Sequence, residues 1–270
     1  MKPKPKNSFT RWPQPLGDAV EGLYAAFAHY PLKPHLDNCP HCSDARDDKI
    51  LHAAPLRELT AEQLGFYAFS SMYTMGDGMD YRHFLPRILE LSLTSNVNPG
   101  LDPWHITDKL NYTGFGFLPA NEHAAIAAFT RSLWAVILTE SPAHTVVVAL
   151  PDSSIGTNSI MWSAEDVLRM AAEFTGEFEQ CLALWHPVQD KIHLRHFADL
   201  VLMNSGNWGP NDLPFVMMTN NDARLRLKSW VLDPAKLAAL ESAAYSEIET
   251  LWADAFDTAA QVLSPHVEAA

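Results

Sequence analysis

One cysteine pair in the sequence has a spacing that could bind a metal ion. Cys39 and Cys42 frame a Cys-Pro-His-Cys turn, with His41 inside it and His35 four residues before it. A Cys-x-x-Cys pair places two thiolates on one turn, which supplies half of a tetrahedral zinc site. The sequence therefore predicts a zinc site held by Cys39 and Cys42, with His35 and His41 as further candidate ligands.

The same turn has two other interpretations. A second Cys-x-x-Cys pair or a His-x(3–5)-His pair is missing nearby, so the turn could be structural, holding two small thiols. Dithiol redox chemistry is the other alternative, although a thioredoxin-type pair opens a helix after a strand and no such strand is predicted. Three cysteines do not indicate a secreted disulfide framework, and they favour a reducing cytoplasm.

Four side chains at the start of a predicted helix could act as acids and bases. Asp77, Asp80, Arg82 and His83 lie within seven residues of one another. Such groups can work as a catalytic pair when their environments push their pKa values apart. The simpler interpretation is helix capping, because Asp80 is a good N-cap residue and carboxylates favour helix N-termini.

Signatures of several common enzyme classes are absent from the sequence. It has no phosphate-binding Gly-x-x-x-x-Gly-Lys-Ser/Thr loop, no Gly-x-Gly-x-x-Gly, no Gly-x-Ser-x-Gly and no His-Glu-x-x-His. These absences make the corresponding nucleotide-binding, serine-hydrolase and metalloprotease families poor matches.

Two sets of carboxylates recur along one face of a predicted helix. The first is Asp166, Glu173 and Glu177, and the second is Glu247, Asp254 and Asp257. Solvated helix faces usually mix charge signs, whereas like charges on one face repel one another. We interpret both faces as candidate partner-binding surfaces, with a merely solvated face as the alternative.

The net charge points to the same kind of partner. The formal net charge is −13, and the whole acidic excess falls after residue 50. An acidic surface repels nucleic-acid phosphate and attracts basic proteins. The composition therefore disfavours nucleic-acid binding and favours a basic protein partner, unless the charge serves solubility alone.

Hydrophobic periodicity predicts an all-α protein, either an irregular helical bundle or a HEAT-like stack of antiparallel helix pairs. Trp134, Trp185 and Trp230 recur at intervals close to the length of HEAT-type repeats. Thr60 and Gln63 form a capping box that starts one helix. The predicted helices cover residues 18–30, 61–72, 80–92, a short segment near 108, 120–140, 163–185, 189–204, 221–231 and 234–262.

These helices are expected to form one domain. Residues 1–15, rich in Pro and Lys, are predicted to be a flexible arm, and residues 16–270 a single α-helical domain with a possible sub-boundary near 142–162. The apolar runs are too short for a signal-peptide core or a membrane span, so the sequence predicts a cytoplasmic protein.

Three sequence blocks together resemble a known group of proteins. They are the Cys39-Pro-x-Cys42 turn, Pro-Leu-Arg-Glu-Leu-Thr over residues 55–60, and Asp-Tyr-Arg-His-Phe-Leu-Pro-Arg-Ile-Leu-Glu-Leu over residues 80–91. They resemble an uncharacterised bacterial family of helical proteins with no known activity, over residues 23–91 and in patches through 109–134. The resemblance implies a bacterial cytosolic origin and no particular chemistry.

The function that these observations favour is binding of another protein without catalysis. The acidic faces suggest an inhibitor or immunity factor that captures a basic toxin enzyme. One alternative is a zinc-dependent enzyme built on Cys39 and Cys42 with histidines, and another is a structural or assembly subunit. Zinc is the one cofactor that the sequence suggests.

Overall fold

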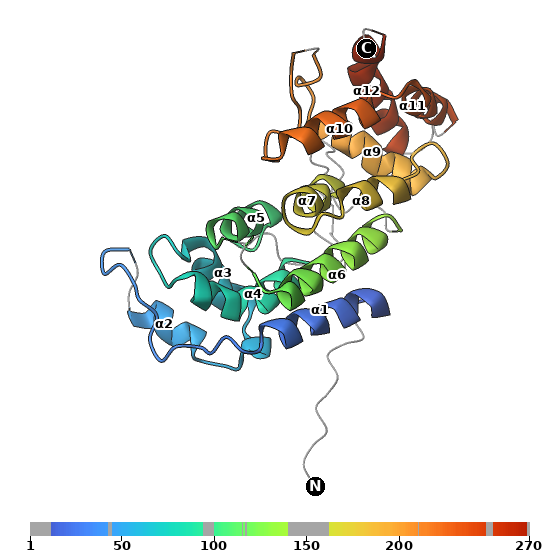
Figure 1. The fold of residues 1–270 in the computed structure, drawn as a ribbon. Coiled ribbons are helices and arrows are strands. Elements are labelled where there is room, and N and C mark those ends of the chain that lie inside the picture. Colours follow the sequence, from blue (N-terminus) through green and yellow to red (C-terminus); the bar gives the residue numbers. More distant parts are fainter. Residues whose placement is uncertain are drawn as a thin grey trace. The chain divides into compact units, whose positions relative to one another are not determined.

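The fold is all-α, as the periodicity predicts. Figure 1 shows the computed structural model, which describes residues 12–42, 45–93, 100–114, 116, 118–139, 162–209, 211–246 and 251–268. Every regular element within these ranges is a helix. None of the described helices combines the length and the apolar character that a membrane span needs.

The chain divides into two compact units. The N-terminal unit comprises residues 1–133 and 155–162, and the C-terminal unit comprises residues 134–154 and 163–270. The sub-boundary predicted near 142–162 lies outside the described residues, which resume at Trp162. Residues 1–11 of the predicted arm also lie outside them, and the first helix already begins at Gln14.

The N-terminal unit is built around α4. Its elements are α1 (Gln14–Phe27), α2 (Ala45–Leu51), the 3-10 turn η1 (Leu56–Glu58), α3 (Ala61–Ser70), α4 (Gly78–Ser92), α5 (Pro103–Tyr112) and most of α6 (Ala120–Ile137). Helix α4 packs against α1, α3 and α5 (Figure 1). Its inward side chains Tyr81, Phe84 and Ile88 are fully buried, as the apolar face of an amphipathic helix should be.

Two capping boxes fix where α3 and α4 begin. Thr60 and Gln63 form the predicted box at α3. At α4 the prediction was wrong in one detail, because Asp77 is the N-cap and Asp80 is its box partner. Asp80 is buried and its carboxylate accepts a hydrogen bond from Lys33 at 3.0 Å, so this carboxylate serves the fold.

The turn between α3 and α4 is held from two sides. Lys109 of α5 is fully buried and donates from Nζ to the Ser71 carbonyl oxygen at 2.5 Å, next to the C-terminal end of α3. On the other side, the backbone N–H of Cys39 donates to Thr74 O at 2.8 Å, and that of Gly76 to Asp37 O at 2.6 Å. These bonds join the Cys-x-x-Cys segment to the turn.

The C-terminal unit has a tryptophan core. Its elements are α7 (Ala164–Met170), the π-helical turn η3 (Ala171–Thr175), α8 (Phe178–Leu184), α9 (Lys191–Met203), α10 (Asn221–Val231), α11 (Pro234–Ser246) and α12 (Leu251–Val267). Trp185 lies 5.3 Å from Trp134 and 5.0 Å from Trp230, measured between ring centroids. The three tryptophans thus meet in one core.

Two of the predicted long helices are each divided in the structure. The helix predicted over 163–185 is wrong, because η3 interrupts it and Gly176 at φ 71° ends it before α8. The helix predicted over 234–262 is also two helices, α11 and α12, which pack against each other. Residues 247–250 between them lie outside the described residues.

Candidate functional site

A set of exposed aromatic side chains gathers on α3, the α3–α4 turn and α5. We call it the aromatic surface, and its members are Phe66 (45% exposed), Phe69 (45%), Tyr73 (55%), Trp104 (42%) and Tyr112 (62%). Large apolar side chains gathered on a surface in this way often mark a binding site, and aromatic residues are enriched in protein interfaces.

Ring contacts link four of these side chains into two groups. Tyr73 and Tyr112 meet edge to face, with ring centroids 5.4 Å apart. His105 lies between Phe69 and Trp104, at centroid distances of 5.1 and 4.5 Å. The surface therefore contains two aromatic groups, one carried by the α3–α4 turn and α5 and the other by α3 and α5, and Phe66 lies one turn before Phe69 on α3.

Polar contacts hold Tyr73 and His105 in place. The Tyr73 hydroxyl donates to Asp108 Oδ2 at 2.7 Å, and this bond raises the pKa of Tyr73. Asp102, the N-cap of α5, binds His105 Nδ1 at 2.5 Å. Neither side chain rotates without losing a hydrogen bond, so the rings are preorganised for a ligand.

The Lys109 ammonium group lies beneath the Tyr73 ring. Its Nζ is 3.2 Å from the ring centroid, and burial lowers the pKa of Lys109 to about 8. Tyr73 thus already receives a cation on one face from within the protein, while more than half of the side chain remains exposed.

The charge around the aromatic surface is negative. Residues 61–77 and 103–112 contain one basic side chain other than histidine, Lys109, and it is buried. The carboxylates of these segments and of the preceding N-cap are Glu62, Asp108, Asp102 and Asp77, and the last of these is paired with Lys33. Because the aromatic rings and the carboxylates both favour cations, the surface is suited to a positively charged ligand.

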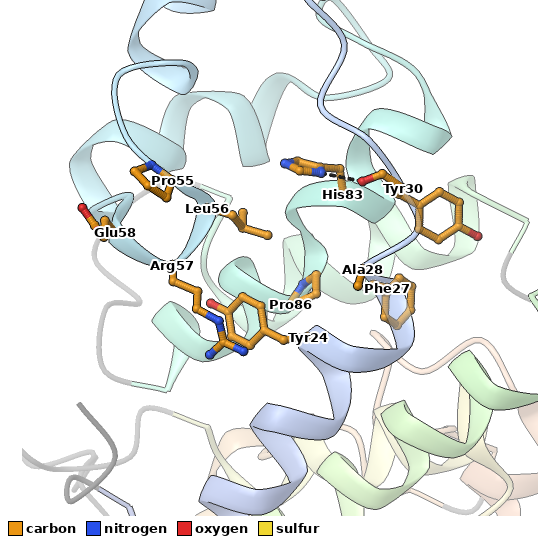
Figure 2. Close-up of a pocket in the computed structure, with 10 residues that line it drawn as sticks. All are labelled: Tyr24, Phe27, Ala28, Tyr30, Pro55, Leu56, Arg57, Glu58, His83 and Pro86. Atoms are coloured by element: carbon orange, nitrogen blue, oxygen red, sulfur yellow. Dashed lines mark hydrogen bonds between the residues drawn. The ribbon is translucent and has the colours of Figure 1, made fainter. Parts of the chain in front are cut away.

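The N-terminal unit also has a pocket of about 430 Å³ between α1, η1 and α4. Figure 2 shows Arg57 lying over Tyr24, with a guanidinium-to-centroid distance of 3.8 Å. Both Arg57 Nη atoms bind Glu21, at 2.5 and 3.0 Å. The charge of Arg57 is therefore already balanced, and the pocket mainly offers apolar walls.

His83 is the imidazole in the wall of this pocket (Figure 2). Its Nδ1 lies 2.8 Å from the Tyr30 carbonyl oxygen. Because a carbonyl only accepts, Nδ1 carries the proton and Nε2 of the neutral ring is an acceptor. The other members of the predicted acid–base group do not join it, since Asp77 and Asp80 bind Lys33 and Arg82 donates to Thr113 O. The pocket can receive an apolar group, and none of these three side chains serves there as an acid–base partner of His83.

The predicted zinc ligands are only partly brought together. Cys39 and Cys42 share a turn, in which the Cys42 N–H donates to Cys39 O at 3.0 Å. His35 is instead exposed and lies 3.3 Å from Asp48 Oδ2. Across the ranges that the structure describes, no three His, Cys, Asp or Glu side chains gather closely enough to hold a metal ion.

The carboxylates of the first predicted acidic face make contacts within the fold. The Glu173 side chain is 2% exposed, lies 3.4 Å from Arg169 Nε, and accepts from the Thr219 N–H. Asp166 accepts from Ser163 N and Oγ in the N-terminal box of α7. Glu177 is the N-cap of α8, beyond the break at Gly176. These three carboxylates therefore do not form one ridge.

The second predicted face is described only in part. Asp254 and Asp257 are exposed on α12, and Asp257 accepts from Gln261 Nε2 at 2.7 Å. Glu247 lies outside the described residues. Two exposed carboxylates therefore remain of this face.

Comparisons with protein-family models, with curated proteins and with solved structures each found no match. The resemblance to an uncharacterised bacterial family stays a prediction, and the geometry of the chain itself has to carry the functional argument.

Proposed function

We propose that this chain is a non-enzymatic protein-binding protein whose aromatic surface docks an arginine-rich segment of a basic partner. The observation that carries the proposal is the set of five exposed aromatic side chains on α3, the α3–α4 turn and α5, four of which are linked by ring contacts into two groups. The partner is the basic protein that the net charge of −13 favours, and the docking surface differs from the acidic faces that the sequence suggested.

An arginine side chain matches both features of this surface. Its planar guanidinium group stacks on aromatic rings, and each such contact is worth about 0.5–2 kcal/mol depending on how far it is desolvated. Asp102 and Asp108 lie beside the rings and can attract the same cation. Rings supply the contact area and carboxylates supply steering, which weakens as salt is added.

The biological role depends on which kind of protein carries the arginine-rich segment. If the segment belongs to a basic toxin enzyme, the chain acts as its inhibitor or immunity factor, and the encounter takes place in the cytoplasm. Binding through a preorganised surface needs neither a metal ion nor an acid–base pair.

The test uses a synthetic peptide of alternating arginine and leucine, with a glutamate–leucine peptide as its counterpart. We expect the arginine peptide to bind with an affinity that falls as salt is raised, measured by isothermal calorimetry. Trp104→Ala and Tyr112→Ala should each raise Kd about tenfold, which corresponds to about 1.4 kcal/mol. Tyr245→Ala is the matched control, since Tyr245 is 84% exposed in the C-terminal unit.

A second pair of variants separates charge from ring contact. Asp108→Asn keeps an acceptor for the Tyr73 hydroxyl but removes the charge, so we expect weaker binding and a smaller salt dependence. Asp254→Asn removes an exposed carboxylate of α12 and should leave binding unchanged. Equal binding of the glutamate peptide, concentration-dependent self-association through the same residues, or a larger effect of Asp254→Asn would each overturn the proposal.

A further inference from the structure

The pocket between α1, η1 and α4 has a lining that the proposed function does not use. Its walls are mainly aromatic rings and proline or leucine side chains: Tyr24, Phe27, Tyr30, Pro55, Leu56 and Pro86. None of the described residues that line it belongs to the aromatic surface. Its volume of about 430 Å³ lies in the range of small-molecule sites, which are mostly apolar with a few polar groups.

The two tyrosines of the lining use their hydroxyl groups inside the protein. The Tyr24 hydroxyl donates to Glu90 Oε2 at 2.6 Å. The Tyr30 hydroxyl donates to Glu122 Oε1 at 2.8 Å, and Figure 2 shows it pointing away from the other labelled side chains. Rotation of either ring would break its hydrogen bond, so both rings are held as fixed walls for a ligand.

The charged side chains of the lining do not attract an anion. The guanidinium group of Arg57 stacks on the Tyr24 ring, and both of its Nη atoms bind Glu21. Arg57 therefore extends the wall, with its charge already balanced. Glu58 also lines the pocket and is exposed, so the charge that it adds disfavours a negative ligand.

His83 supplies a hydrogen-bond acceptor to the pocket. Its Nδ1 carries the proton, because that atom faces the Tyr30 carbonyl oxygen, and Nε2 of the neutral ring is left as an acceptor. In Figure 2, Nε2 points away from Tyr30, toward the side where Pro55 and Leu56 lie. An acceptor set in apolar walls favours a ligand with a hydrogen-bond donor, since a purely apolar ligand would desolvate the acceptor without pairing it.

We propose that this pocket binds a neutral aromatic small molecule that carries one N–H or O–H donor, such as an indole or a phenol. The ring of the ligand packs against the tyrosine and phenylalanine rings, and its donor binds His83 Nε2. This inference does not depend on the proposed function, because the aromatic surface and the pocket share no residue.

The test compares ligands that differ in one property, by ligand-observed NMR titration of the full chain. Benzofuran has the shape of indole, with an oxygen in place of the N–H. We expect indole to bind with a Kd of about 0.1–1 mM, and benzofuran about tenfold more weakly because Nε2 stays unpaired. Indoleacetate should bind about tenfold more weakly than its neutral amide, because it brings a carboxylate to the acidic rim.

Two tryptophan substitutions on α1 and its C-cap locate the site. Ala28 is exposed and lines the pocket, so Ala28→Trp should fill it and abolish the binding of indole. Ala25 is exposed one turn earlier and is not part of the lining, so Ala25→Trp is the matched control and should leave the Kd unchanged. Urea midpoints of both variants check that they fold.

A third variant removes the acceptor. His83→Leu keeps an apolar wall, and it should weaken indole to the affinity of benzofuran while changing the Kd of benzofuran less than about twofold. The comparison of indole with benzofuran on the unaltered chain needs no variant, so it tests the role of His83 even where a substitution impairs folding.

Four results contradict the proposal. They are the absence of indole binding at millimolar concentration, equal affinities of indole and benzofuran for the unaltered chain, indole binding that survives Ala28→Trp, and equal affinities of indoleacetate and its amide. Tighter binding of N-acetyltryptophanamide than of indole would instead assign the pocket to a side chain of a protein partner, and the small-molecule assignment would be wrong.

Discussion

The aromatic surface of the N-terminal unit and the carboxylates of α7, η3 and α8 in the C-terminal unit differ in what their side chains do for the fold. The aromatic side chains are 42–62% exposed, although rings of this size are usually buried. Glu173 is the opposite case, because a carboxylate that is usually exposed is here buried beside Arg169. The sequence marks the carboxylates as a candidate binding surface, but only the aromatic side chains have exposed contact area to offer a partner.

This difference shows that the tertiary contacts of a side chain decide whether it is available to a binding partner. Arg169 and the Thr219 N–H satisfy Glu173, so a docking protein would have to break those contacts first. Tyr73 keeps its hydroxyl bonded to Asp108 and still exposes more than half of its side chain. A binding surface needs side chains that the fold holds in place and leaves exposed to solvent.

The largest expected effect comes from disturbing the close approach of Gly100 to the backbone of α3, the helix that carries Phe66 and Phe69. Gly100 has φ 83°, and a Cβ atom there would lie 2.1 Å from the Phe69 backbone nitrogen. We expect Gly100→Ala to lower the free energy of unfolding by about 3–5 kcal/mol, because backbone strain and overpacking add. Urea unfolding followed by tryptophan fluorescence measures this loss.

Gly17→Ala is the matched control. An added Cβ at Gly17, within α1, meets nothing within 4 Å, so alanine should stabilise the helix by about 0.5–1 kcal/mol. A Gly100→Ala variant as stable as the Gly17→Ala variant would show that α3 does not depend on this close approach.

The second effect tests whether the predicted acidic face is structural. Glu173→Ala leaves Arg169 buried without its carboxylate, and we expect a loss of about 3 kcal/mol in unfolding free energy. Asp254→Ala on the exposed surface of α12 should change the same quantity by less than about 0.5 kcal/mol. Equal effects of the two substitutions would mean that the two carboxylates are equally available to a partner, and the comparison would fail.

The helices were largely predictable because their signals are local. The Thr60–Gln63 box and the stripe of Leu64 and Tyr67 predict the start and the buried face of α3. The exposure of Phe66 and Phe69 could not be predicted from such a local signal. Helix α3 is apolar on several faces, and only tertiary packing decides which face is covered. The aromatic residues at positions 66, 69 and 73, which recur at helical spacing, were the sequence signal that could have indicated a second apolar face.

The candidate sites were less predictable than the helices. Carboxylate spacing predicts a common face only if one helix is continuous, and the π-helical turn at 171–175 with Gly176 breaks that continuity. The cysteine turn was visible in the sequence, but the separation of its thiols from His35 depends on the contact of His35 with Asp48. Spacing along the chain carries no information about such competing partners.

The smallest expected effect is a difference in pH dependence between the two regions. In the C-terminal unit, burial raises the pKa of Glu165 from 4.5 to about 7. The folded state thus holds this proton more tightly than the unfolded chain, so its contribution to stability is full below about pH 4.5 and is lost as pH rises through about 7. Beneath Tyr73, burial lowers the pKa of Lys109 from 10.5 to about 8, so its contribution grows as pH rises from about 8 to 10.5.

Single substitutions should act separately on these two pH dependences of the unfolding free energy. Glu165→Gln keeps the hydrogen bond to Asn204 in a neutral form, and it should reduce the slope of the stability profile between about pH 4.5 and 7, where Asp199 with its pKa raised to about 6 supplies the rest, while leaving the alkaline range unchanged. Lys109→Met should flatten the profile between about pH 8 and 10.5, at the cost of the bond to Ser71 O. Urea midpoints measured across pH check both, with Asp254→Asn as the exposed control. If Glu165→Gln keeps the parent slope in the acidic range, burial does not raise the pKa of Glu165, and the contrast with the exposed aromatic surface loses its electrostatic basis.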